Sequence, residues 1–90
     1  MRIIFKHSYR CPISVTAKEE MDNFLKNNKN DMEFELIDVL GNRKRSNEVA
    51  EEFGIIRESP QVIILDKNNN VLWTASHRRI TEESIKSAFG

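Results

Sequence analysis

Cysteine is the scarcest reactive residue in this chain of 90 residues, because it occurs only once, at Cys11. A single thiol cannot close an internal disulfide, which excludes a small secreted scaffold held together by disulfide bridges. We therefore expect the protein to work in a reducing cytoplasm.

The sequence also lacks an excess of either charge, because 14 basic residues balance 14 acidic ones. This balance gives no electrostatic reason to expect nucleic acid or a membrane surface as a partner. No apolar run approaches the roughly 18 residues of a membrane-spanning helix, and the N-terminal segment has the pattern of a strand and not of a signal peptide. We expect one domain over residues 1–90, and a monomer.

Metal-binding and hydrolase signatures are absent as well. The two histidines, His7 and His77, are spaced from Cys11 in a way that matches no metal site. A Cys–His hydrolase is disfavoured because no oxyanion-hole motif or orienting partner is present. The basic residues at 43–45 have no interleaved aromatic residues, which indicates a solvated helix face and not a nucleic-acid surface.

The apolar spacing predicts alternating strands and helices followed by a hairpin and a last helix. The expected elements are a strand at 2–6, a helix from Pro12 to about Asn28, a strand at 33–38, a helix at 43–53 ending at Gly54, strands at 61–66 and 71–76, and a helix capped by Thr81 that buries Ile85, Ala88 and Phe89. We interpret the asparagine-rich residues 67–70 as the hairpin loop.

This order is β-α-β followed by β-β-α. The first unit should be right-handed with parallel strands, and a hairpin added beside the first strand completes the sheet. The prediction is an α/β fold with a four-stranded mixed sheet and three helices, which resembles the thioredoxin-like core in its glutaredoxin-sized form.

Cys11 is the candidate nucleophile because it directly precedes Pro12, and proline is favoured at the first position of a helix. The sulfur then lies at a helix N-terminus, where free N–H groups and the helix dipole stabilise a thiolate. The cationic side chains of Lys6, His7 and Arg10 would add to this effect if they lie near the sulfur. The alternative is a small buried cysteine, but the neighbouring residues are polar and indicate a loop tip.

Ser14 completes a Cys-x-x-Ser motif. Its hydroxyl can donate a hydrogen bond to the thiolate but cannot form a disulfide. Because the chain has no second cysteine, a mixed disulfide on Cys11 must be resolved by an outside thiol. The plainer interpretation of Ser14 is a polar residue in the first turn of a helix.

Ser59 and Pro60 come directly before the third predicted strand. In thioredoxin-like folds a cis-proline at this place faces the cysteine, and the backbone of the preceding residue can pair with a bound substrate. We favour the cis isomer here, although only about 5–6% of X–Pro bonds are cis. A proline that begins an edge strand is the alternative.

At these residues the chain resembles the monothiol bacilliredoxin family of bacteria that use bacillithiol. The resemblance rests on Phe5-Lys6-His7-Ser8, Cys11-Pro12-Ile13-Ser14, Arg43 with Ser46-Asn47, Glu58-Ser59-Pro60-Gln61-Val62, and Ser76-His77 with Ile80-Thr81. It implies that Cys11 takes bacillithiol from a mixed disulfide on a client protein. Bacillithiol would be a co-substrate and no cofactor would be bound, while Pro12, Ser14, Arg10, His7, Ser59 and Pro60 would activate the thiol or contact the substrate.

The sequence departs from that family in three ways. Arg10 replaces the usual threonine, which would lower the thiol pKa or favour the carboxylates of bacillithiol's malyl group. Arg78 stands where an aromatic residue is common, and an N-terminal segment found in the family is missing, which suggests a trimmed or divergent member. Two alternatives stay open: use of glutathione or another thiol, and a redox-inert thioredoxin-like adaptor.

Overall fold

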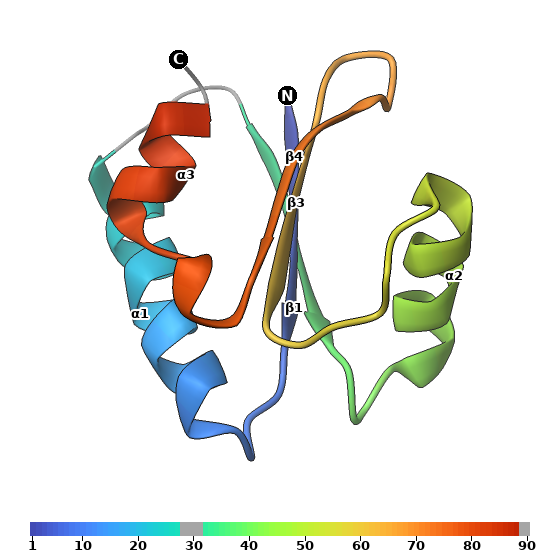
Figure 1. The fold of residues 1–90 in the computed structure, drawn as a ribbon, viewed down its shortest axis with the longest axis horizontal. Coiled ribbons are helices and arrows are strands. Elements are labelled where there is room, and N and C mark those ends of the chain that lie inside the picture. Colours follow the sequence, from blue (N-terminus) through green and yellow to red (C-terminus); the bar gives the residue numbers. More distant parts are fainter. Residues whose placement is uncertain (28–31, 89–90) are drawn as a thin grey trace.

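The computed structural model describes residues 1–27 and 32–88, and its elements follow the predicted order (Figure 1). They are β1 (Arg2–His7), α1 (Pro12–Asn27), β2 (Glu33–Asp38), α2 (Arg43–Phe53), β3 (Gln61–Leu65), β4 (Val71–Ser76), the 3-10 helix η1 (His77–Arg79) and α3 (Glu82–Ala88). The predicted bounds of β2, α2 and β4 are confirmed, while β1 also includes His7 and β3 ends before Asp66. The predicted contributions of Asn28 and Phe89 lie outside the described residues.

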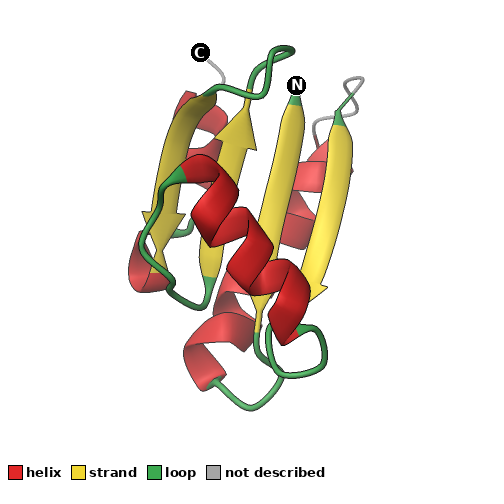
Figure 2. Ribbon diagram, turned by 90° about the vertical axis from the view of Figure 1, so that its right-hand side faces the viewer, coloured by secondary structure: helices red, strands yellow, loops and turns green. Residues whose placement is uncertain are grey.

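The strands form one sheet in the order β2-β1-β3-β4. β1 runs parallel to β2 and antiparallel to β3, and β3 pairs with β4 as an antiparallel hairpin. α1 and α3 cover one face of the sheet and α2 covers the other (Figures 1 and 2). Within the described residues, this confirms the predicted mixed sheet of four strands with three α-helices.

The central strands separate two hydrophobic cores. Successive residues of β1 point to opposite faces of the sheet. Ile3 and Phe5 therefore pack under α1 and α3, whereas Ile4 packs with Ile37 and Val49 under α2. Burying each such side chain contributes about 1.5–3 kcal/mol, so the two cores fix the sheet as a rigid base for the loops at its ends.

The helix ends are fixed by caps. The side chain of Asn42 accepts a hydrogen bond from the backbone N–H of Arg45 at 3.2 Å, which begins α2. Gly54 ends α2 in the left-handed conformation with φ of 62°, as its position predicts. Thr81 caps α3, because its hydroxyl accepts the N–H of Ser84 at 3.0 Å.

No helix in residues 1–27 or 32–88 is both long enough and apolar enough to cross a membrane.

Candidate active site

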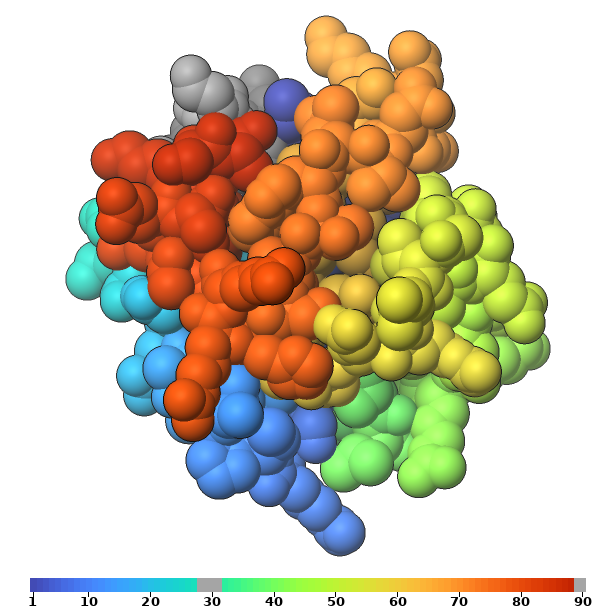
Figure 3. All heavy atoms as spheres, in the orientation of Figure 1, coloured from blue at the N-terminus to red at the C-terminus, as the bar shows by residue number. Residues whose placement is uncertain are grey.

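One end of the sheet gathers the segments that carry the predicted site. β1 and β2 end there side by side, with His7 opposite Asp38, and β3 begins there, with Gln61 opposite Lys6. The segment after β1 leads into α1, and the turn after β2 and the segment before β3 lie against it at the same end (Figures 1 and 3). The fold therefore brings Cys11 and Pro60 to one end of the molecule.

Cys11 is the capping residue of α1. Its carbonyl accepts the first helical hydrogen bond from the N–H of Val15 at 3.2 Å, and its own N–H donates to the carbonyl of Ser8 at 3.2 Å. Pro12 is the first residue of the helix, as its missing N–H favours. The thiol is half-buried and free.

The turn lowers the pKa of the Cys11 thiol. The largest cause is the hydrogen bond from the backbone N–H of Ser14, and desolvation opposes it. The N–H of Ile13 and the hydroxyl of Ser14 lower the pKa further. The two backbone N–H groups are unpaired donors of a helix N-terminus, and together with the hydroxyl they stabilise a thiolate, which is the nucleophilic form of cysteine.

Ser14 is fully buried in the first turn of α1. Its hydroxyl oxygen accepts the N–H of Ser8 at 3.3 Å, so it ties the loop after β1 to the helix that carries Cys11. The same hydroxyl lies within hydrogen-bonding reach of the thiol. Ser14 therefore both shapes the turn and stabilises the sulfur.

The Ser59–Pro60 peptide bond is cis. Pro60 is buried, and its carbonyl accepts the N–H of His77 at 3.0 Å. The hydroxyl oxygen of Ser59 is buried without a hydrogen-bond partner among the described residues. His77 has φ of 56° and begins η1 directly after β4, with its Nδ1 atom 3.9 Å from a carboxylate oxygen of Glu58.

The three basic side chains before Cys11 are placed differently. His7 is buried under the turn, its ring meets that of Tyr9 edge to face at 4.3 Å, and burial is the main cause that lowers its pKa. Lys6 points to the opposite face of the sheet, where its ammonium donates to the carbonyl of Ser46 at 3.0 Å. Arg10 is exposed. The thiolate is thus stabilised by the backbone turn, and the expected help from these charges is not among the causes of its lowered pKa.

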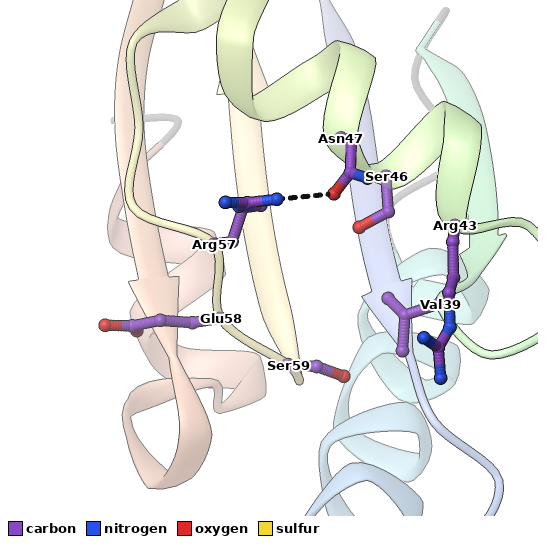
Figure 4. A pocket seen from close by; sticks show the side chains of 7 residues that line it. All are labelled: Val39, Arg43, Ser46, Asn47, Arg57, Glu58 and Ser59. Carbon is purple, nitrogen blue, oxygen red and sulfur yellow. Dashed lines mark hydrogen bonds between the residues drawn. The ribbon is translucent and has the colours of Figure 1, made fainter.

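A cavity of about 340 Å³ lies between the start of α2 and the segment before β3 (Figure 4). Its lining includes Arg43, Asn47 and Arg57 together with Ser59. The helical spacing of 43, 46 and 47 places those side chains on one face of α2, a signal present in the sequence. Nothing in the sequence indicated that Arg57 would join them, because its position depends on how the chain enters β3.

A metal centre is not formed by the described residues, since nowhere in ranges 1–27 and 32–88 do three His, Cys, Asp or Glu side chains gather as potential ligands.

Comparison with known proteins identifies both family and fold. The family model for the monothiol bacilliredoxin BrxC matches residues 1–85. A solved structure described as a candidate oxidoreductase with a thioredoxin fold is 29% identical with a TM-score of 0.88, and the match covers 99% of this chain and 77% of that one.

Two thioredoxins are similar in fold. Thioredoxin 1 from the thermophilic eubacterium Thermosipho africanus TCF52B is 21% identical with a TM-score of 0.71, covering 99% of this chain and 90% of that chain. Thioredoxin-2 of the malaria parasite is 18% identical with a TM-score of 0.78, covering 98% of this chain and 79% of that chain. The predicted thioredoxin-like fold is therefore confirmed, and the family supports a thiol redox role.

Proposed function

Because the chain belongs to the monothiol bacilliredoxin family, we propose that it removes bacillithiol from mixed disulfides on client proteins through Cys11. The observation that carries this proposal is the free Cys11 thiol at the N-terminus of α1, with its lowered pKa and no second cysteine in the chain. A thiolate held in this way can attack a disulfide, and a lone one must pass its adduct to another molecule.

The reaction proceeds in two thiol–disulfide exchanges. The thiolate of Cys11 attacks the bacillithiol sulfur of the mixed disulfide, a new disulfide forms on Cys11, and the client leaves as its thiolate. A second bacillithiol thiolate then attacks the bacillithiol sulfur on Cys11, which releases bacillithiol disulfide and restores the Cys11 thiolate. Each cycle therefore consumes one free bacillithiol, which leaves in a disulfide with the bacillithiol taken from the client.

The surrounding residues have separate tasks in this scheme. Pro12 starts the helix. The backbone N–H groups of Ile13 and Ser14 donate hydrogen bonds to the sulfur and stabilise its negative charge whenever Cys11 is a thiolate. Ser59 and Pro60 lie at the same end of the sheet, where the backbone of Ser59 would align the disulfide for attack. A linear approach of the three sulfurs requires such alignment.

Intact mass spectrometry tests the proposal. The reduced protein is mixed with a test protein whose single cysteine carries bacillithiol. We expect the wild type to gain one bacillithiol while the thiol of the test protein reappears, and Cys11→Ala to gain none. Val15→Ala, an exposed position on the same helix, is the matched control and should behave as the wild type.

A second substrate separates the alternatives. If the bacillithiol adduct is left intact and the same test protein carrying glutathione is reduced, the protein uses a different thiol. If neither adduct is transferred, the proposal is wrong and a redox-inert binding module is the better account.

A further inference from the structure

The cavity beside Ser59 contains positive charge that no carboxylate of the described residues pairs with. Arg43 and Arg57 both line it. The guanidinium of Arg57 donates to the side-chain oxygen of Asn47, a neutral partner, at 3.0 Å. Within the described part of the chain neither arginine forms an ion pair. Two exposed guanidinium groups without carboxylates are therefore available to a ligand.

A third basic side chain, that of Lys6, contacts the backbone of a residue in the cavity wall. Lys6 is completely buried, and its ammonium donates one hydrogen bond, to the carbonyl of Ser46, which also lines the cavity. No carboxylate of the described residues pairs with it, and the charge of Arg57 is near enough to lower its pKa further after burial has done so. A buried ammonium without an anion is costly for a fold, so a negative ligand here would relieve an existing cost.

The opposite wall supplies an unsatisfied hydroxyl. The hydroxyl oxygen of Ser59 is buried without a partner, and its side chain points toward Arg43 and Val39 across the cavity (Figure 4). Glu58, the only acidic residue in the described lining, extends the other way, with its carboxylate 3.9 Å from His77. The cavity therefore presents hydrogen-bond donors, and no carboxylate of its described lining points into it.

Arg43 belongs both to this cavity and to a second one nearer the thiol end of the molecule. Arg43 lines a second cavity, of about 470 Å³, together with Tyr9 and Arg10. Arg10 is the residue directly before Cys11. Cys11 itself lines neither cavity, so a ligand held here would have to reach from the sulfur past Arg43 to Ser59.

We propose that the cavity lined by Arg43, Arg57 and Ser59 binds the carboxylate-bearing part of the low-molecular-weight thiol. This inference rests on the proposed function and specifies how the co-substrate is recognised. Planar guanidinium groups bind carboxylates with paired hydrogen bonds, and the Ser59 hydroxyl adds a neutral donor. Bacillithiol carries its carboxylates on the malyl group; glutathione also carries carboxylates, so the two sources must be separated by experiment.

The test compares transfer rates from one neutral peptide with a single cysteine, loaded with bacillithiol, glutathione or 2-mercaptoethanol. We expect Arg43→Gln and Arg57→Gln each to slow transfer of bacillithiol about tenfold, as for the loss of a charged hydrogen-bond partner, and to leave transfer of uncharged mercaptoethanol unchanged. Lys44→Gln is the matched control, because Lys44 is exposed on the same turn of α2 and is not part of the cavity. It should transfer both groups at the wild-type rate.

The outcomes separate the cavity from the reaction. Unchanged transfer of both bacillithiol and glutathione in both arginine variants overturns the cavity proposal and leaves the proposed function intact. Equal slowing of bacillithiol and mercaptoethanol also overturns it, because the arginines would then act on the thiol or the fold. Slowing of glutathione alone supports carboxylate binding and assigns glutathione as its source.

Direct binding distinguishes failure of the function from failure of the site. S-methyl bacillithiol cannot exchange disulfides, and its binding to Cys11→Ser protein is followed by the amide NMR signals of Ser46, Asn47 and Ser59. Signal shifts that disappear in Arg43→Gln support the site even if the wild type transfers nothing. Unshifted signals at millimolar ligand overturn it.

Discussion

Two clusters of positive charge flank the start of α2, and they are built in opposite ways. Against β2, Arg45 and Arg2 share the carboxylate of Glu35, at 2.8 Å and 3.0 Å. Beside the cavity, Arg43 and Arg57 have no carboxylate among the described residues. Arg43 and Arg45 are two positions apart, which places them about 200° apart around the helix axis. Arg45 therefore faces β2, whereas Arg43 faces the cavity.

The difference separates charges that hold the fold from charges that are left for a ligand. An arginine paired within the protein has its hydrogen-bonding capacity satisfied and its field cancelled nearby. An unpaired one beside a cavity keeps both available. The equal numbers of basic and acidic residues conceal this, because the balance holds for the chain and not for each surface.

The largest expected effect comes from removing both unpaired arginines. The double variant R43Q/R57Q should transfer bacillithiol about a hundredfold more slowly than the wild type if the two contributions add. Arg45→Gln should transfer within about twofold of the wild type, because its partner is Glu35 and not the ligand. Single-turnover transfer rates measure both, and a comparable loss in Arg45→Gln would remove the distinction between the clusters.

Removing the buried ammonium of Lys6 should raise the stability of the protein and slow the transfer of bacillithiol. Lys6→Met keeps the length of the side chain and removes a buried charge, so the free energy of unfolding at pH 7 should rise by about 1–2 kcal/mol. Bacillithiol transfer should become slower because the cavity loses positive potential. Urea unfolding and transfer rates measure the two effects, and a destabilised Lys6→Met protein would contradict the argument.

The same substitution has a defined pH dependence. Burial lowers the pKa of Lys6 in the fold, so its charged form costs stability at every pH below the folded value. That cost is relieved as the pH rises through the folded pKa toward about 10.4, the pKa of an ordinary lysine. The stability advantage of Lys6→Met should therefore shrink in alkaline solution.

The stabilisation from the ion pairs of Glu35 should be lost in acid. The hydrogen bond from Arg45 is the main cause that lowers the pKa of Glu35, so the pair's stabilisation is complete above about 4.3 and is lost as the pH falls through the lowered value. Glu35→Gln should cost about 1 kcal/mol at pH 7 and approach the wild type in acid. Urea unfolding against pH measures this, with Glu33→Gln, exposed on the same strand, as the control.

The smallest expected effect concerns the thiol itself. Arg10→Gln should leave the pKa of Cys11 almost unchanged, because an exposed charge is screened and the backbone of Ser14 is the main cause of the lowered value. Ser14→Ala should raise that pKa, since it removes the hydroxyl. The pH dependence of the alkylation rate with iodoacetamide measures both, and a larger shift in Arg10→Gln would show that the exposed cations act on the thiolate.

The sequence predicted those parts of the site that depend on neighbouring residues. Pro12 after Cys11 is enough to place the sulfur at a helix N-terminus, and Gly54 is enough to end α2, because capping is local. The order of strands followed from hydrophobic spacing and the handedness of the β-α-β unit. The fold and the position of Cys11 at a helix N-terminus could therefore be predicted from the sequence alone.

The cavity was not accessible in the same way. Lys6, Arg43 and Arg57 lie far apart in the chain and meet only because β1 packs under α2 and the segment before β3 crosses beside it. The sequence left open whether Lys6 lies near the sulfur, and alternation along β1 sends its side chain to the opposite face. The direction of a polar side chain at the end of a buried strand depends on register, which the sequence specified only loosely here.

The solitary cysteine has a consequence for how the protein meets oxidative stress under the proposed function. Each cycle consumes a free thiol from the surroundings, so the turnover rate follows the size of that pool. When the pool is exhausted, the protein stops with Cys11 capped as a disulfide. A capped sulfur is shielded from irreversible oxidation to the sulfinic acid, and it becomes active again when free thiol returns. Under the proposed function, the absence of a second cysteine thus makes the activity of the protein depend directly on the supply of the free thiol that regenerates Cys11.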